Sequence, residues 1–163
     1  MVKICEYCFN IFNHDVKTCP MRSCGGWSLI GVDDMMAEVL MHYWMAGYQT
    51  IFSCAGHLYE NLFNPYIGFG FHHEGPEGPL NIEYCRETLS RLHDYLVKFN
   101  KDHRVIIEKP KQYNNRDMFE VKAIETIKAI EHKDYSVRSV RLGVQGQFIG
   151  FLYDALEDLP IDD

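Results

Sequence analysis

Four of the six cysteines in this 163-residue chain stand in two close pairs near its start. Two residues separate Cys5 from Cys8, and four separate Cys19 from Cys24. Cysteines a few residues apart can turn both sulfur atoms to one point, and two such pairs can surround one tetrahedral ion, for which zinc is the usual occupant. The spacing therefore predicts a zinc site made by these four residues. Four protein ligands leave no position open for a substrate, so we expect the ion to be structural.

The second pair departs from the usual two-residue spacing, but its flanks suit a tight metal knuckle. Pro20 follows Cys19, and glycines that tolerate a positive φ follow Cys24. His14 is the reserve ligand if one cysteine does not bind. Two alternatives remain open, namely disulfides and four free thiols. Disulfides require an oxidising compartment, whereas residues 1–5 begin no apolar signal segment, so we expect a cytoplasmic protein.

A second group of reactive residues follows a predicted strand over residues 48–53 and consists of Ser53, Cys54, Gly56 and His57. A strand that ends here and enters a short helix at 58–62 would direct successive N–H groups toward an anion. Gly56 would let the ligand approach the backbone, Ser53 would donate a hydrogen bond, and His57 would bond or exchange a proton. Cys54 is the candidate nucleophile of an enzymatic alternative, with His57 or His72 as base.

His72 and His73 end the next predicted strand, at residues 65–71. Only one of them can face the 53–57 turn, because neighbouring residues of a strand point to opposite faces. His72 therefore joins the candidate ligand-binding residues, and a second metal site with Cys54 and His57 is an alternative. A purely structural turn is an equally weighted interpretation.

The order of these motifs resembles that of an uncharacterised family of small proteins from bacteria, phages and prophages. The similarity covers residues 5–71 and rests on the cysteine pairs, Val32-Asp33-Asp34, Gly47-Tyr48-Gln49-Thr50, the 53–57 turn and Tyr66-Ile67-Gly68-Phe69. This resemblance implies a zinc ribbon and a phage or prophage origin, but no known activity. A weaker similarity links Ser53, Cys54 and Gly56 to the Ser-Cys-x-Gly turn of the wybutosine-synthesis methyltransferase, which implies that such a turn can face a nucleotide-like ligand.

The remaining pattern predicts an α+β fold in which a zinc ribbon at residues 1–31 precedes an α/β domain at 32–163. The ribbon ends in a strand at 27–30. We expect a small sheet covered by about four helices, because short strands alternate with longer apolar-periodic segments. Beyond the short 58–62 helix, helices are predicted from about 33 to 46, at 83–100, 116–132 and 146–159, and a further strand at 104–108. The pattern of residues 135–143 is ambiguous and is compatible with an extended chain.

The formal net charge of −7 argues against broad binding to nucleic acid. The charge is uneven, because residues 98–116 carry six basic and two acidic side chains while residues 154–163 carry five acidic side chains and no basic ones. The favoured function is a cytosolic zinc-containing binding protein whose 53–57 turn holds a small phosphorylated or nucleotide-like ligand. The alternatives are a protein that docks on a host protein or an RNA, and a Cys/His-dependent enzyme. No membrane partner is expected.

Overall fold

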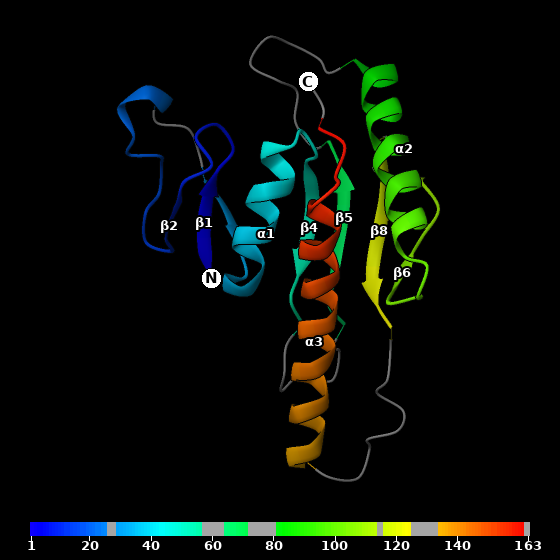
Figure 1. Ribbon diagram of the computed structural model, residues 1–163. Coiled ribbons are helices and arrows are strands. Elements are labelled where there is room, and N and C mark those ends of the chain that lie inside the picture. Colours follow the sequence, from blue (N-terminus) through cyan, green and yellow to red (C-terminus); the bar gives the residue numbers. More distant parts are fainter. Residues whose placement is uncertain (26–28, 57–63, 72–80, 114–115, 125–133, 162–163) are drawn as a thin grey trace.

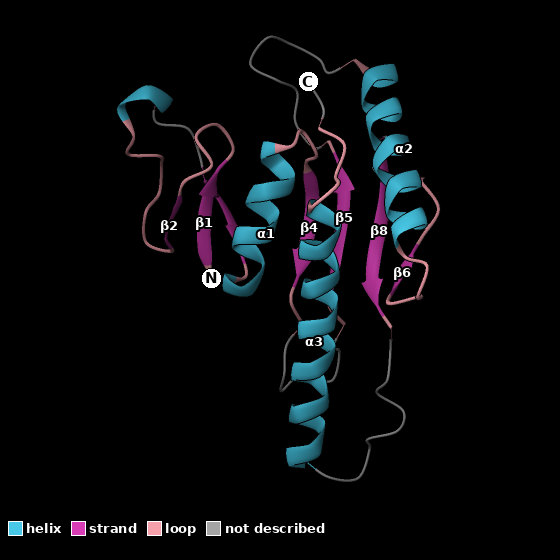
Figure 2. Cartoon of the chain, viewed as in Figure 1, coloured by secondary structure: helices cyan, strands magenta, loops and turns pink. Residues whose placement is uncertain are grey.

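The computed structural model describes residues 1–25, 29–56, 64–71, 81–113, 116–124 and 134–161. The fold is α+β, as predicted, with a small N-terminal sheet followed by a larger sheet and three α-helices in the described part (Figures 1 and 2). The elements are β1 (Val2–Cys5), β2 (Ile11–Asn13), a 3-10 turn η1 (Arg22–Cys24), β3 (Leu29–Val32), α1 (Asp34–Met45), β4 (Thr50–Cys54), β5 (Tyr66–Gly70), α2 (Ile82–Phe99), β6 (Val105–Ile107), β7 (Lys111–Tyr113), β8 (Arg116–Ala123) and α3 (Asp134–Leu156). None of the described helices is both long and apolar enough to cross a membrane.

Both sheets are antiparallel. The small sheet has the order β2-β1-β3, and the large sheet has the order β4-β5-β8-β6, with β7 pairing to β8 on the same side as β6. The predicted boundary between residues 1–31 and 32–163 falls inside β3. Ile4 and Val32 are buried in the same apolar cluster as the large sheet and its helices. The division into two modules stays a prediction.

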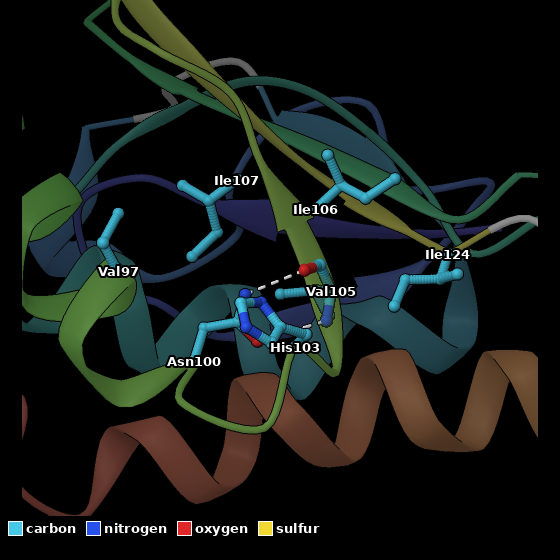
Figure 3. Close-up of a pocket in the computed structure, with 7 residues that line it drawn as sticks. All are labelled: Val97, Asn100, His103, Val105, Ile106, Ile107 and Ile124. Atoms are coloured by element: carbon cyan, nitrogen blue, oxygen red, sulfur yellow. Dashed lines mark hydrogen bonds between the residues drawn. The ribbon is translucent and has the colours of Figure 1, made fainter.

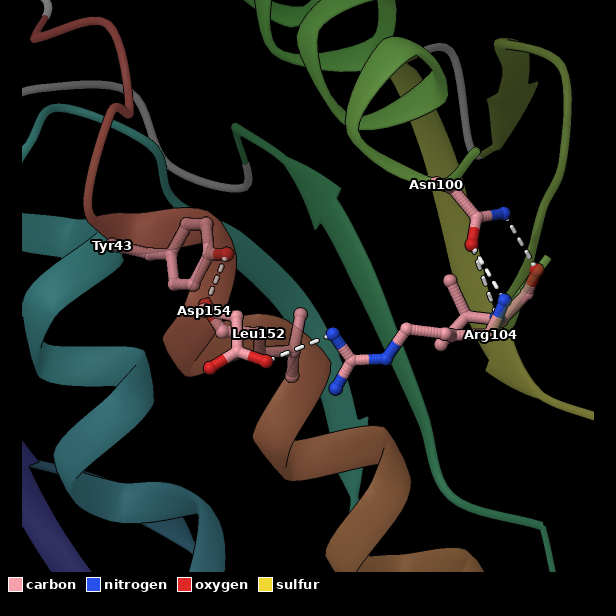
Figure 4. A network of polar contacts seen from close by, with 6 residues as sticks. Tyr43, Asn100, Arg104, Leu152 and Asp154 are labelled. Atoms are coloured by element: carbon pink, nitrogen blue, oxygen red, sulfur yellow. Dashed lines mark hydrogen bonds and ion pairs between the residues drawn. The ribbon is translucent and has the colours of Figure 1, made fainter. Parts of the chain in front are cut away.

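The three described helices pack on one face of the large sheet, which we call the covered face (Figure 2). The Phe69 and Phe119 rings lie 5.4 Å apart on this face. Phe69 contacts Tyr43 of α1, and Phe119 contacts His93 of α2. The Tyr43 hydroxyl also donates a 2.8 Å hydrogen bond to the Leu152 carbonyl of α3 (Figure 4). Aromatic packing therefore joins α1 and α2 to the strands, and the Tyr43 hydrogen bond joins α3 to α1.

The sequence prediction was wrong about the segment that begins at residue 116. Residues 116–123 form β8 and not the first half of a helix, so the described chain has three helices instead of about four. The alternation of this segment explains the difference: Phe119, Val121 and Ala123 are buried, while Glu120 and Lys122 are only half-buried. Helical spacing of Val121 and Ile124 suggested the wrong period. The 58–62 helix and residues 125–133 lie outside the described residues.

Residues 135–143, whose sequence pattern is ambiguous, are helical and not extended, because α3 runs from Asp134 to Leu156 without a break. Gly143 at the end of this segment weakens its helical signal, since glycine costs about 1 kcal/mol in a helix interior. The apolar side chains of α3 that are buried against the core outweigh that cost; they are Phe148, Ile149, Phe151, Leu152 and Ala155.

The glycines of β5 lie where other residues of the chain approach the strand closely. A Cβ at Gly68 would lie 2.7 Å from the Phe52 ring. A Cβ at Gly70 would lie 2.6 Å from the Ile51 side chain and 3.0 Å from the Asp117 carbonyl oxygen. The large β4 side chains therefore lie across β5 where β5 has none.

Gly70→Ala is expected to lower the free energy of unfolding by about 1–3 kcal/mol, because the Asp117 carbonyl is part of the sheet and cannot move aside. Gly146→Ala is the matched control, since a Cβ there meets no atom within 4 Å. This control should raise stability by up to about 1 kcal/mol. Urea unfolding of both variants measures the difference, and an unchanged Gly70→Ala midpoint would contradict the close packing.

Candidate metal centre and the second cysteine turn

The first pair of zinc-site cysteines is placed by the central strand of the small sheet. Cys5 is the last residue of β1, and the tight turn that follows brings Cys8 back beside it. This turn is closed by hydrogen bonds from Phe9 N–H to the Cys5 carbonyl (2.9 Å) and from Cys5 N–H to the Asn10 carbonyl (3.1 Å). The local backbone therefore sets both sulfur positions.

The second pair is supplied by the segment between β2 and β3. Cys19 precedes η1 and Cys24 ends it. The four-residue spacing is accommodated by this 3-10 turn, in which Cys24 N–H donates to the Met21 carbonyl (3.1 Å). The longer spacing is therefore compatible with convergence of the two pairs.

All four sulfur atoms lie within 4.8 Å of one another. Cys5, Cys19 and Cys24 are buried, and Cys8 is half-buried. The Cys8 and Cys19 sulfurs are 3.7 Å apart, whereas a disulfide requires about 2.05 Å. A tetrahedral zinc ion with Zn–S bonds of about 2.3 Å places its sulfurs about 3.8 Å apart. The four cysteines therefore fit a zinc ion, and none of the six cysteines forms a disulfide.

Both cysteine pairs are followed by a residue in the left-handed backbone region. Gly25 after Cys24 has φ 66°, as its residue type predicted, and Phe9 after Cys8 has φ 60°. A non-glycine residue in this region is strained. The Phe9 side chain packs against the main core, which compensates for that strain. No local residue pattern predicts this role of Phe9.

Sequence reasoning also missed Asn10, whose side-chain Nδ2 donates to the Cys8 sulfur at 3.1 Å. Burial opposes ionisation of Cys8, but hydrogen bonds with the backbone and side chain of Asn10 and with the Cys24 and Cys19 thiols together outweigh it and lower the pKa of the Cys8 thiol to about 7. Burial raises the pKa of Cys19. Burial, reinforced by the neighbouring cysteines, raises the pKa of Cys24 to about 12. Metal-free Cys19 and Cys24 therefore keep their protons at neutral pH.

His14, the reserve ligand, is exposed just after β2 and does not belong to the cysteine cluster. His57 and His72 lie outside the described residues. Their predicted roles, including the second metal site with Cys54, stay predictions.

The structure separates Ser53 from Cys54. Ser53 pairs with Ile67, which pairs with Val121, and both of these partners are buried on the covered face. Cys54 pairs with Tyr66, which pairs with Lys122, on the opposite, open face of the sheet. Because side chains alternate along a strand, the Ser53 hydroxyl and the Cys54 thiol point to opposite faces.

In the described part of this turn, residues 53–56, hydrogen bonds to three side chains hold the backbone. Ala55 N–H donates to the Asp33 carboxylate at 2.8 Å. Gly56, with φ 88°, directs its N–H to the Cys54 sulfur at 3.3 Å. The Gln145 side-chain amide donates to the carbonyls of Ala55 (2.7 Å) and Gly56 (3.1 Å). The Asp33 carboxylate therefore accepts a hydrogen bond from one of the N–H groups that were predicted to bind an external anion.

Asp33 has a structural role in this turn. The residue stands at the N-terminal cap position of α1, but its side chain makes no capping hydrogen bond. Its carboxylate instead joins the start of α1 to the 53–57 turn. Gln145, which sequence reasoning also missed, is 2% exposed, and its Oε1 has no hydrogen-bond partner in the described part of the chain.

Zinc affinity is expected to rise with pH below neutrality, because the ion binds thiolates and must displace the protons of Cys19 and Cys24. Loss of at least two protons implies an increase of about a hundredfold or more per pH unit. Competition with a zinc chelator at about pH 6 and about pH 7 measures the slope. A pH-independent affinity would contradict a thiolate site.

Comparisons with known proteins identify no relative. No family model, no curated protein and no solved structure matches the chain. The resemblance to small phage proteins therefore stays a prediction. What the comparisons leave in place is a chain with a four-cysteine cluster that fits zinc.

Proposed function

We propose that the protein is a zinc-containing binding protein whose ion is structural. The observation that carries this proposal is the convergence of four thiols, three of them buried, within 4.8 Å. A closed set of four sulfur ligands favours a structural ion over a catalytic one, because no ligand position remains for water or substrate. The ion would hold together a ribbon whose own buried cluster consists of Cys5, Cys19 and Cys24.

Cys24→Ser is expected to reduce zinc affinity by about a hundredfold or more and to make the ribbon sensitive to protease, because three ligands no longer close the site. Cys54→Ser is the matched control, since Cys54 lies in β4 and outside the cluster. Metal analysis and limited proteolysis of both variants give the test. Equal zinc content in the two variants would contradict the assignment.

A second candidate function is ligand binding at the 53–57 turn. One observation favours it: the buried Gln145 Oε1, bonded to no described residue, belongs to an amide that contacts this turn. The Asp33 carboxylate and this amide oxygen both accept hydrogen bonds. A nucleotide-like ligand that donates N–H groups from its base therefore suits the site better than a bare phosphate, which the nearby carboxylate would repel.

The alternative is that the ribbon docks on another macromolecule and the 53–57 turn is only structural. Three exposed apolar side chains support this alternative, because each lies within three residues of a zinc ligand; they are Tyr7, Ile11 and Met21, which are 41–43% exposed. A protein partner suits these side chains better than an RNA. The ribbon carries only three basic residues against two acidic ones up to residue 31.

Thermal-shift measurements with a panel of nucleosides and nucleotides, with inorganic phosphate as the control probe, separate the two candidates. Ligand binding at the turn predicts that at least one base-containing compound raises the melting temperature and that phosphate does not. Gln145→Leu should abolish that shift. If no compound raises the melting temperature, the ligand-binding proposal fails and the docking alternative is left.

A further inference from the structure

The C-terminal end of α2 and the edge strand β6 form an apolar groove of about 350 Å³. Figure 3 shows Val97 and Ile107 on one side of β6, and Ile106 and Ile124 on the other. Val97, Ile106 and Ile124 remain 48%, 45% and 39% exposed. The groove therefore leaves branched apolar side chains in water on both sides of a sheet edge.

On its outer edge, the β6 backbone is hydrogen-bonded at Val105 and has no described partner at Ile107. The N–H and C=O of Val105 both bond to the Asn100 side chain, at 3.3 and 2.8 Å, and so point away from β8 (Figures 3 and 4). In an antiparallel pair, alternate residues share this direction, so Ile107 also directs its N–H and C=O away from β8. No described residue bonds these two groups of Ile107. They are a place where one more strand can pair.

The charge around the groove is basic, although the chain as a whole is acidic. Lys98, Lys101 and Lys109 are exposed beside the lining residues and pair with no described acid. Two other basic side chains of residues 98–116 are in ion pairs within the chain. Arg104 pairs with Asp154 at 2.8 Å (Figure 4), and Lys111 pairs with Glu108 and Glu120. The sixth, Arg116, is exposed at the start of β8. Asp102 is the one exposed acid in this part of the rim.

We propose that this groove binds an extended, acidic segment of another protein, which pairs with Ile107 as an added strand. Alternate side chains of such a segment fall on the two faces of the sheet. One would lie against Val97 and the next against Ile106 and Ile124. Acidic residues on the segment would pair with the three lysines. Strand addition of this kind derives affinity from main-chain hydrogen bonds and specificity from the pockets for alternate side chains.

The same observations disfavour two other occupants. A second copy paired through its own β6 would bring lysines against lysines. A nucleic acid would satisfy the lysines, but five of the seven lining residues are aliphatic. The one ring among them is the His103 imidazole, whereas single-strand binding uses a series of aromatic rings on which successive bases stack.

An acetylated, amidated peptide that alternates acidic residues with valine tests the proposal, with the same peptide carrying lysine in place of the acids as the control probe. The acidic peptide should bind the zinc-loaded chain saturably with a Kd below about 1 mM. It should shift the NMR resonances of Val97, Ile106 and Ile107 and slow amide exchange of Ile107 by about tenfold or more. The lysine peptide should not bind.

Ile106→Asp should raise the Kd of the acidic peptide by at least about tenfold, because the substitution places a carboxylate beside the acidic segment. Ile82→Asp is the matched control, since Ile82 is 67% exposed at the other end of α2, and it should leave binding unchanged. A combined Lys98→Glu, Lys101→Glu and Lys109→Glu variant should prefer the lysine peptide instead. This variant keeps the test decisive if Ile106→Asp does not fold.

The proposal is overturned if the acidic peptide does not saturate, or if Ile106→Asp binds it like wild type. It is also overturned if an oligouridine probe shifts the same resonances at lower concentration than the peptide. A concentration-dependent dimer that Ile106→Asp abolishes would assign the groove to a second copy of the chain.

Discussion

The requirement that four sulfur atoms meet at one point governs the N-terminal part of this protein. The ribbon has a small separate buried cluster, which consists of Cys5, Cys19 and Cys24, with Cys8, Phe12 and Leu29 around them. Four thiols this close have little reason to converge unless an ion replaces their protons. The other contribution comes from outside, because Ile4 and Val32 are buried in the core of the large sheet. This shared core therefore stabilises the ribbon, and a metal ion bound by the four thiols would add the second stabilising force.

The strand that leaves the ribbon also determines the geometry of the second cysteine turn. β3 leads directly into Asp33, whose carboxylate binds Ala55 N–H, while Gln145 of α3 binds the next carbonyls. The turn is therefore tied both to the beginning of α1 and to α3. This arrangement explains why a turn that looks suited to an anion carries an acidic side chain of the chain itself. It also shifts the expected ligand from phosphate toward a donor of hydrogen bonds.

The zinc ligands, α1, α2 and the strands β4 to β6 could be predicted, because cysteine spacing and apolar periodicity are local properties of the sequence. The failures concern properties that are not local. β8 lies between β5 and the β6–β7 edge, and this position selects period two over the helical spacing that Val121 and Ile124 suggested. α3 tolerates three glycines because its aromatic side chains are buried by residues distant in sequence. Asp33 and Gln145 stand 112 positions apart, and each forms a hydrogen bond with Ala55 of the turn. Neither residue could be assigned to the turn from its neighbours in the chain.

The central claim is that one zinc ion is held by four thiolates, and X-ray absorption at the zinc edge tests it most directly on the purified, zinc-loaded protein. The account predicts a first shell of four sulfur atoms at about 2.3 Å. That shell should contain no nitrogen or oxygen neighbour, since His14 lies outside the cluster. A shell that contains histidine nitrogen or water oxygen, or a protein that retains no zinc, would contradict the account.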